Sequence, residues 1–362
     1  MKVIVIGAGL GGLALASGLL RAGIDVAVHE RDPSPHVRRQ GYRLHLSDMG
    51  IDALTSVMAP ERRAAFLATA HTPSPRFVRF DHTLAGVEVL EHSGLHLSID
   101  RQTLRESLLP EVAETITYGT RLTGFQVVAD RVTARFDDGT TVTGDVLVGA
   151  DGINSAVRGQ YLPHARIVGT GLVQLYGKIP VELAEGMDNV FTAITGPGHR
   201  VVGVAPTRDY ATCSFGARAE DLPAGLNLMT QDQLRSLVMD LTHGWHPLVR
   251  RMISQWYDVF PLELRTSVPI PPWQTTRVTL LGDAAHAMSP AAGAGANLAL
   301  RDAAALTQAL TQALAPVLAR GGPLIPALRS YEQEMIDSGF AAVRMSAANG
   351  ARLLGQDPLP SS

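Results

Sequence analysis

The start of the chain carries the feature that most restricts how it can fold. Residues 3–6 are the β-branched run Val-Ile-Val-Ile, which favours a short buried strand over a helix. Residues 7–12 form the glycine-rich segment Gly-Ala-Gly-Leu-Gly-Gly, and an apolar run continues to Leu20. This order predicts a strand, a tight turn and a helix, as at the start of an α/β protein.

The same stretch resembles a membrane anchor or a signal peptide in one respect, because no charged residue occurs from Val3 to Leu20. Glycines interrupt it repeatedly, however, and closely spaced glycines destabilise a lipid-facing helix. Residues 19–23 offer no small-x-small site of the kind that ends a signal peptide. No other uncharged run approaches the length of a membrane span, so the sequence predicts no membrane association.

The spacing of the glycines indicates what the turn binds. The segment matches G-x-G-x-x-G, in which Gly7 permits the tight turn, Gly9 lets a pyrophosphate approach the backbone, and Gly12 lets helix and strand pack closely. The amino end of the helix then holds the phosphates. A second strand is predicted over 25–29, and Glu30 at its end can accept hydrogen bonds from a ribose. The segment therefore predicts a dinucleotide site.

Composition excludes several classes of protein. The 362 residues are 46% hydrophobic and 18% charged, and a net charge of −3 with scattered basic residues indicates no nucleic-acid partner. The single cysteine, Cys213, rules out an intrachain disulfide and fits a reducing cytoplasm, and we predict that it is a core residue of a strand. His243 and His246 have no cysteine or acidic partner at metal-ligand spacing, so no metal site is predicted.

A meander of three strands is predicted in the middle of the chain. Alternating apolar residues and short turns place its strands at 124–129, 131–136 and 140–143. It leads into a buried strand over 145–149, which ends in a sharp Asp-Gly turn at 151–152.

A further buried strand, starting at Arg277, delivers Asp283 at its carboxyl end, where open α/β sheets place ligand-binding groups. The glycine-rich segment 290–297 follows, and then a helix predicted from Leu298. Glycines here let the helix amides approach a planar ligand, and the amino end of the helix carries about half a positive charge. Such an end stabilises an anion.

Together with residues 100–105, these segments resemble the class A flavoprotein monooxygenases, the single-component aromatic hydroxylases. In that family the first motif binds the ADP part of FAD, and the Asp151-Gly152 motif with Arg158 is associated with FAD and NAD(P)H. The Gly282-Asp283 motif contacts the ribityl chain, and the 290–297 loop lies against the isoalloxazine. The cofactor-binding residues that the resemblance implies are Gly7, Gly9, Leu10, Gly11, Gly12, Glu30, Arg31, Arg38, Arg39, Arg101, Asp151, Asp283, Gly293, Gly295, Ala296 and Asn297.

The chain departs from the family pattern at two points. Ala294 stands where many members have glutamine, so any hydrogen bond from that side chain is absent. The chain ends at Ser362, before the thioredoxin-like domain of the larger hydroxylases. It is therefore similar to the shorter branch, which includes salicylate-hydroxylase-like and tetracycline-inactivating monooxygenases.

The predicted fold is α/β: a Rossmann-like FAD-binding domain with the three-stranded β-meander, a β-sheet substrate domain of α+β type, and a long C-terminal helix. We expect the FAD-binding domain to be discontinuous, over 1–72, 96–170 and 269–362. The substrate-binding domain is expected to comprise 73–95 and 171–268, where alternating segments predict strands.

Within a predicted strand over 172–178, Gln174, Tyr176 and Lys178 share one face. This face either looks onto the substrate or is a solvated outer face, and the pattern favours neither. If it faces the substrate, Gln174 and Tyr176 line the substrate site together with Pro290. Pro290, with its fixed φ, would form a rigid wall near the reactive edge of the cofactor. Tyr176 or His45 would polarise a substrate phenol.

The resemblance implies an enzyme in which NADPH or NADH reduces FAD and dioxygen adds at flavin C4a. The resulting hydroperoxide would hydroxylate or epoxidise a small electron-rich substrate, aromatic or polyketide-like. The sequence has no second G-x-G-x-x-G, so we expect NAD(P)H to bind transiently, and we expect a monomer or homodimer. The alternatives are an FAD-dependent oxidase or reductase without oxygen insertion, and an inactive flavin-binding protein.

Overall fold

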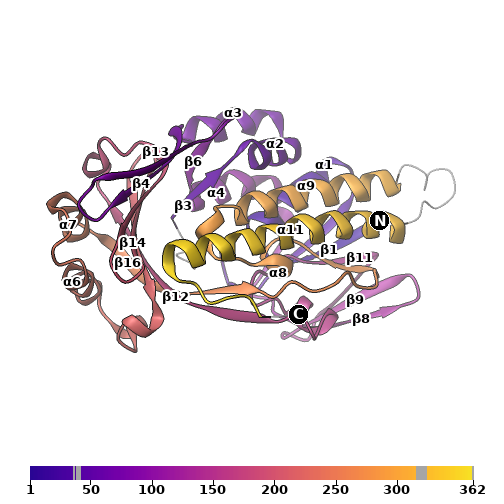
Figure 1. Ribbon diagram of the computed structural model, residues 1–362. Coiled ribbons are helices and arrows are strands. Elements are labelled where there is room, and N and C mark those ends of the chain that lie inside the picture. Colours follow the sequence, from indigo (N-terminus) through magenta and orange to yellow (C-terminus); the bar gives the residue numbers. More distant parts are fainter. Residues whose placement is uncertain (36, 38–41, 315–323, 361–362) are drawn as a thin grey trace.

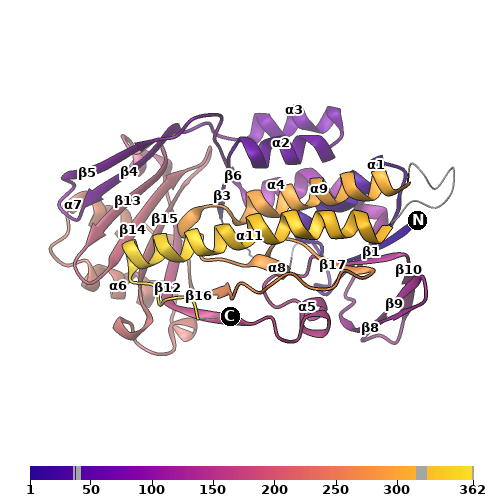
Figure 2. The same cartoon turned by 45° about the vertical axis from the view of Figure 1, so that its right-hand side comes forward.

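A parallel sheet lies at one end of the molecule and a larger sheet at the other, with two long helices, α9 (Gly295–Leu314) and α11 (Leu324–Leu354), running side by side between them (Figures 1 and 2). The computed structural model describes residues 1–362 except 36, 38–41, 315–323 and 361–362. Arg38 and Arg39, two of the expected cofactor contacts, therefore lie outside the described residues.

The parallel sheet has five strands in the order β17-β11-β1-β2-β7. Val3 of β1 pairs with Val146 of β11 and Val26 of β2, and all three residues are buried, as expected for a parallel sheet covered on both faces. Helix α1 (Leu10–Arg21) connects β1 to β2, which confirms the predicted strand, turn and helix. The strands are β1 Lys2–Ile6, β2 Asp25–Glu30, β7 Ile116–Tyr118, β11 Val146–Gly149 and β17 Val278–Leu280.

Helices α1, α4 (Arg101–Val112), α9 and α11 share one hydrophobic core with this sheet. The predicted meander is a separate three-stranded antiparallel sheet that enters β11, and it consists of β8 Leu122–Val128, β9 Arg131–Phe136 and β10 Thr141–Gly144. The Rossmann-like part of the predicted fold is therefore present, as is the long C-terminal helix.

The larger sheet has seven strands in the order β16-β12-β15-β14-β13-β4-β5, antiparallel except for the β13–β4 pair. One face packs on helices α6 (Gln231–Leu241) and α7 (Pro247–Ser254), and it includes Leu175 and Cys213, so the cysteine is a core residue as predicted. The strands are β4 Ser74–Asp81, β5 Gly86–Glu91, β12 Ile167–Ile179, β13 Asn189–Gly196, β14 Arg200–Pro206, β15 Ala211–Arg218 and β16 Tyr257–Ser267.

A two-stranded antiparallel sheet of β3 (Arg43–Leu46) and β6 (Leu97–Asp100) lies beside both larger sheets. The Arg43 guanidinium donates to the Val190 carbonyl of β13, which ties this small sheet to the seven-stranded one. The remaining helices are α2 Asp48–Val57, α3 Pro60–Thr69, α5 Ala156–Tyr161, α8 Asp283–His286 and the short 3-10 helices η1 Ala113–Thr115, η2 Val181–Ala184, η3 Ala219–Asp221, η4 Leu226–Leu228 and η5 Pro290–Ala292.

Helix α9 begins earlier than predicted, at Gly295 rather than at Leu298. The Leu298 amide already donates to the Ala294 carbonyl at 2.9 Å, so the segment 295–297 is the first helical turn. Gly295 lowers the helix propensity of the segment, so the sequence does not reveal that the helix starts there. A glycine is tolerated in the first turn, where the backbone amides have no intrahelical hydrogen-bond partner. Among the described helices, none combines the length and hydropathy needed to cross a membrane.

Candidate active site

Three neighbouring strands of the parallel sheet end at one edge, and each leads into a segment that the sequence singles out. β1 leads into the glycine turn at Gly7, β11 into Asp151, and β17 into Asp283. Because β17, β11 and β1 are adjacent in that order, the three segments lie side by side. The sheet thus gathers residues from the beginning, middle and end of the chain.

The glycine turn has the geometry that its spacing predicts. Gly7 has a φ of +106°, and a Cβ added there would lie 2.5 Å from the Ala150 carbonyl oxygen. A Cβ on Gly12 would lie 2.1 Å from the Gly7 carbonyl oxygen, so only glycine lets α1 pack this closely on the turn. Beside Gly9, by contrast, the described structure holds no heavy atom within 4 Å of an added Cβ. The amino end of α1 therefore faces open space.

Glu30 lies at the end of β2, and its side chain is buried at 7% exposure. Its carboxylate accepts hydrogen bonds from the Ala8 amide at 2.8 Å and the Asp32 amide at 2.9 Å. The carboxylate therefore braces the glycine turn, next to the place where a ribose contact is predicted. Arg31 is exposed beside it.

Helix α4 brings two arginines to this edge. Asp100 caps the helix by accepting from the Gln102 and Thr103 amides, and the Tyr210 hydroxyl donates to its other oxygen at 2.6 Å. Burial lowers the pKa of Arg101, and the neighbouring Asp283 carboxylate partly offsets this. The expected cofactor contact Arg101 is thus held close to Asp283.

Arg105 lies one turn further along α4 and was not predicted as a site residue. Its Nε donates to the Ala8 carbonyl at 3.4 Å, and a terminal nitrogen donates to the Pro35 carbonyl. It therefore links α4 to the glycine turn. Two sequence signals point to it: it falls in the segment 100–105 that resembles the family, and its position four residues after Arg101 places both side chains on one helix face.

Asp151 begins the segment after β11, and its two carboxylate oxygens differ. Oδ2 accepts from the Ala156 and Val157 amides at 2.7 and 3.3 Å, whereas Oδ1 is buried with no hydrogen-bond partner among the described residues. Burial raises the pKa of this carboxyl. Arg158 donates to the Ala284 carbonyl at 2.9 Å, so it ties this segment to α8.

Asp283 is exposed at the start of α8, directly after Gly282, whose φ is +58°. The Gly282 amide donates to Asp302 Oδ2 at 3.0 Å, and the same oxygen lies 2.6 Å from His286 Nε2. Both His286 and Asp302 are 1% exposed. This buried pair fixes the turn that presents Asp283. Asp302 was not predicted, because it is sixteen residues from His286 and the two meet only when α9 packs on α8.

The loop before α9 is held by Asn297 from its first turn. The Asn297 side chain accepts from the Ser47 amide and donates to the His45 and Gly293 carbonyls, at 2.9 to 3.2 Å. Its polar atoms therefore organise the loop, while the loop backbone and the amino end of α9 remain to face a ligand. Pro290 is exposed at the start of η5, and Gly293 has a φ of +62°.

Tyr176 lies on the face of β12 that is turned toward the parallel sheet. Burial raises the pKa of Tyr176 to about 12, and the charge of Arg101 acts in the opposite direction. The ring stacks on Phe260 at 5.5 Å. Gln174, on the same face, donates to the Ser214 hydroxyl at 2.9 Å. Tyr176 therefore lies near Arg101 and not on a solvated outer face, and its contact with a substrate stays a prediction.

His45 lies on β3, and its Nδ1 is 3.7 Å from the position that a Cβ on Gly293 would take. Its Nε2 is 2.8 Å from His96 Nδ1, and His96 Nε2 is 3.1 Å from the Ser93 carbonyl oxygen. A carbonyl oxygen can only accept, so the Nε2–H of a neutral His96 donates to Ser93. The Nδ1 of His96 then accepts a hydrogen bond from the Nε2–H of His45. His45 Nδ1 is then an unprotonated acceptor toward the loop. Burial and nearby Arg43 lower the pKa of His45 to about 3.

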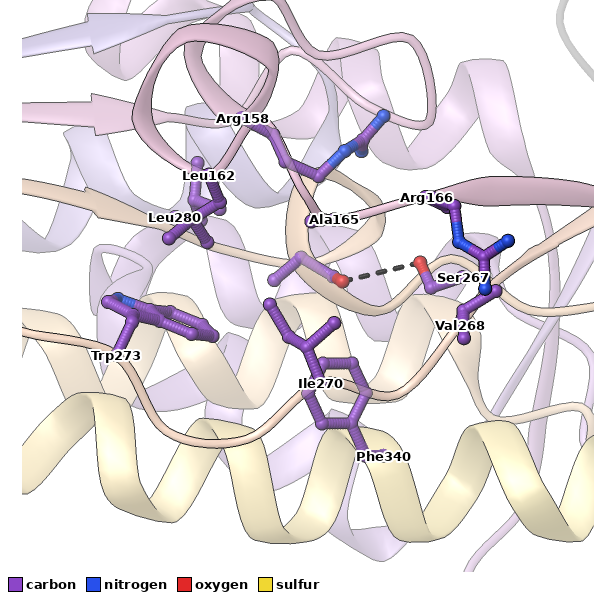
Figure 3. Close-up of a pocket in the computed structure, with 11 residues that line it drawn as sticks. Arg158, Leu162, Ala165, Arg166, Ser267, Val268, Ile270, Trp273, Leu280 and Phe340 are labelled. Carbon is purple, nitrogen blue, oxygen red and sulfur yellow. Dashed lines mark hydrogen bonds between the residues drawn. The ribbon is translucent and has the colours of Figure 1, made fainter. Parts of the chain in front are cut away.

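A small cavity lies next to α8, between α5 and α11 (Figure 3). It is lined by Arg158, Trp273 and Phe340 among others, and the Ser267 hydroxyl beside it donates to the Ala285 carbonyl. Its volume of about 10 Å³ is room for about one water molecule. It is therefore too small to be the substrate site.

The edge of the parallel sheet fits a dinucleotide that carries a flavin. The space beside Gly9 is open, Asp151 Oδ1 has no described partner, and the Asp283 carboxylate is exposed. These three features lie along one line of adjacent strand ends, and the positive end of α9 lies next to it. Within the described ranges, no group of histidine, cysteine and carboxylate side chains has the arrangement of a metal site.

Comparison with known proteins agrees with this geometry. The 6-hydroxynicotinate 3-monooxygenase of Pseudomonas fluorescens is 28% identical over 378 residues, covering 99% of this chain and 93% of that protein. The dual O-methyltransferase/FAD-dependent monooxygenase CTB3 of Cercospora beticola is 30% identical over 420 residues, covering 99% of this chain and 47% of that protein. The chain thus spans about half the length of CTB3.

Among solved structures, Klebsiella pneumoniae HpxO complexed with FAD and uric acid is similar to this chain, with a TM-score of 0.84 and 26% identity. The similarity covers 99% of this chain and 90% of that one. A family model described as FAD binding domain matches residues 1–344. The chain therefore belongs to the FAD binding domain family, and its relatives are class A FAD-dependent monooxygenases.

Proposed function

We propose that this protein is an NAD(P)H-dependent flavoprotein monooxygenase, which inserts one oxygen atom from dioxygen into a small, electron-rich, aromatic or polyketide-like substrate. The observation that carries the proposal is the convergence of Gly9, Asp151 and Asp283 at the ends of three adjacent strands. Open α/β sheets bind dinucleotides across such an edge.

Bound FAD would supply electron transfer and the activation of dioxygen. The protein contributes position and charge. The open amino end of α1 beside Gly9 receives the pyrophosphate, and Glu30 lies within reach of a ribose. Asp283 offers acceptors for the ribityl hydroxyls, and the amino end of α9 offsets negative charge on the reduced ring.

The substrate is placed between the β12 face and the loop that starts at Pro290. Tyr176, with its raised pKa, stays protonated and can donate a hydrogen bond to a substrate oxygen, and Gln174 offers an amide nearby. Pro290 has no amide hydrogen and a fixed φ, so it forms a rigid wall. One relative is named for 6-hydroxynicotinate, and the solved structure of HpxO is a complex with uric acid; both are small ring compounds and support a substrate of this size.

His45 is the candidate hydrogen-bond acceptor for a substrate hydroxyl. Its Nδ1 faces the loop at Gly293, and its Nε2 is held by His96. A substrate hydroxyl that donates to Nδ1 is polarised without losing its proton, since the lowered pKa keeps the His45 ring neutral. Polarisation of a phenol hydroxyl makes the ring carbon richer in electrons, which favours oxygen insertion.

A test begins with the visible spectrum of the purified protein, in which bound flavin is yellow. Oxygen consumption with NADPH or NADH is then measured with and without a panel of phenols and hydroxypyridines, and products are analysed after reaction under labelled dioxygen. We expect a substrate to stimulate NAD(P)H oxidation and one labelled oxygen atom to appear in the product. Stimulated oxidation that yields only hydrogen peroxide with every compound would favour the oxidase or reductase alternative, and a protein that takes up no flavin would contradict both.

A further inference from the structure

A second cavity, of about 420 Å³, lies at the outer end of the seven-stranded sheet. Its walls come from β4, from the turn between β13 and β14, and from the last turn of α11, which Figure 2 shows reaching the sheet beside β14. Arg79, Thr195, His199 and Arg352 line it. None of these residues belongs to the candidate active site, and none is a site residue that the sequence predicts.

The cavity has more positive than negative charge on its walls. Arg79 donates from Nε to Glu88 at 3.1 Å, and a terminal nitrogen of Arg352 lies 3.9 Å from the other Glu88 oxygen. One carboxylate therefore serves two guanidinium groups. In the part of the chain that the structure describes, no hydrogen bond uses the terminal nitrogens of Arg79. Glu88 holds Arg79 through Nε. The two terminal NH2 groups of Arg79 therefore form a fork that suits a carboxylate or phosphate.

The cavity continues the face on which the substrate is placed. Phe191, Ala193 and Thr195 alternate along β13, so they lie on one face of the sheet. A Cβ added at Gly203 on β14 would lie 2.5 Å from the Phe191 ring and 2.9 Å from the Ser214 hydroxyl, the partner of Gln174. Gln174, Ser214, Phe191 and Thr195 therefore all lie on the same face of the sheet.

Helix α11 also contacts both the cavity and η5. The Asn349 side chain donates to the Ala291 carbonyl in η5, next to Pro290. Arg352 follows three residues later, about 4.5 Å further along the helix axis. The last turns of α11 therefore connect η5 with the wall of this cavity.

We propose that Arg79 and Arg352 form a subsite for an anionic oxygen group, a carboxylate or a phosphate. The anion site concerns only this cavity, and the identity of the ligand that carries the group rests on the proposed function. The group belongs either to the oxygenated substrate or to NADPH, and the two sources differ in their kinetic consequences. Glu88 orients the arginines when no ligand is bound and competes with the ligand for them.

The experiment uses the full chain loaded with FAD, and calorimetric titration at low salt with benzoate, with its neutral analogue benzamide, and with inorganic phosphate. We expect Arg79→Gln and Arg352→Gln each to weaken binding of benzoate or phosphate about five- to tenfold, and to leave benzamide unaffected. Arg76→Gln is the matched control, because Arg76 is exposed on the opposite face of β4 and should change nothing.

Glu88→Gln gives the opposite sign and separates the proposal from damage to the fold. Removal of the competing carboxylate should tighten binding of the anion about fivefold, which a misfolded protein would not do. Glu91→Gln is its control, because Glu91 lies three residues further along β5, where it pairs with Arg76. Equal anion affinity in the wild type, Arg79→Gln and Glu88→Gln, or no measurable anion binding, would overturn the proposal.

The steady-state KM values identify the source of the anion. A rise in the KM for NADPH in Arg79→Gln, with the KM for NADH unchanged, assigns the subsite to the cofactor phosphate. A rise in the KM for an anionic substrate alone assigns it to the substrate. If anion binding follows the predicted variants but no labelled oxygen enters any product, the subsite stands and the proposed function fails.

Discussion

The parallel sheet and the seven-stranded sheet present their functional side chains in different ways. In the parallel sheet, the segments that follow β1, β11 and β17 form the site at the strand ends, through the backbone at Gly9 and the carboxylates of Asp151 and Asp283. In the seven-stranded sheet, Gln174 and Arg79 project from the middle of separate strands. Turns at strand ends require particular residues at fixed spacing, whereas a side chain on a strand face can be exchanged without harm to the strand. This predicts that variants of the first region lose FAD, whereas variants of the second region retain it.

Gly12→Ala should have the largest effect, because it breaks the contact between α1 and the turn. An added Cβ would lie 2.1 Å from the Gly7 carbonyl oxygen, so the backbone must move. We expect the free energy of unfolding to fall by about 3 kcal/mol or more, with loss of flavin, as measured by chemical denaturation and absorbance. Gly159→Ala in α5 is the control, since an added Cβ there meets nothing within 4 Å. Equal stability of the two variants would contradict the close packing.

Asp302→Asn should be nearly as destabilising, at about 3 kcal/mol, because His286 loses its buried partner. Burial alone lowers the pKa of His286, but the Asp302 charge and hydrogen bond outweigh it and raise the pKa above 6.5. The pair's contribution is therefore fully present below pH 6.5 and is lost as the pH rises through the folded-state pKa. We expect the stability difference between wild type and variant to shrink as the pH rises, in denaturation series from pH 6 upward. A difference that stays constant or grows would show that His286 is neutral.

Gly9→Val separates cofactor binding from folding. Because an added Cβ meets no described atom within 4 Å, the fold should be unaffected, but the side chain would occupy the proposed pyrophosphate position. We expect FAD affinity to fall at least about 100-fold, or about 2.7 kcal/mol, with the unfolding curve of the apoprotein unchanged. Normal flavin content in this variant would remove the basis for the assignment of the first region.

Asp283→Ala should weaken FAD binding about tenfold, or about 1.4 kcal/mol, through loss of acceptors for the ribityl hydroxyls. The measurement is flavin retention after dialysis and the dissociation constant for added FAD. Asp283→Asn keeps one acceptor oxygen and should retain an intermediate affinity. Undiminished retention in Asp283→Ala would mean that this carboxylate does not contact the cofactor.

Gln174→Leu should have the smallest effect and should leave FAD binding unchanged. It removes the hydrogen bond to Ser214 on the face where the substrate is placed, so we expect the KM for a substrate found by screening to rise about threefold. A parallel fall in flavin retention would mean that the two regions are not separable in function, and the comparison above would fail.

The fold could be predicted well where local sequence sets the backbone. The strand, turn and helix at Gly7, the meander and the faces of β12 follow from glycine positions, short turns and alternation. The start of α9 was placed three residues late, because Gly295 lowers helix propensity while Asn297 holds the turn through bonds to distant residues. Domain limits and the contacts of individual residues with FAD remain predictions.

Residues that act through a partner on another element were not visible in the sequence. Arg105 reaches the glycine turn only because α4 packs beside α1, and His96 meets His45 only because β6 pairs with β3. Arg79 and Arg352 share Glu88 across a strand pair and a helix end. No spacing rule connects such positions.

The sequence by itself determined the dinucleotide turn, the identity of the three strand-end segments and their membership of one family, because glycine geometry and strand burial are local requirements. Only the tertiary structure decided which side chains from distant parts of the chain meet: Asp302 beneath the turn that presents Asp283, His96 behind His45, and Arg79 with Arg352 around Glu88. The physical reason is that hydrogen bonds and charge pairs form between neighbours in space, and the order of strands in a sheet, not the order of residues in the chain, makes them neighbours.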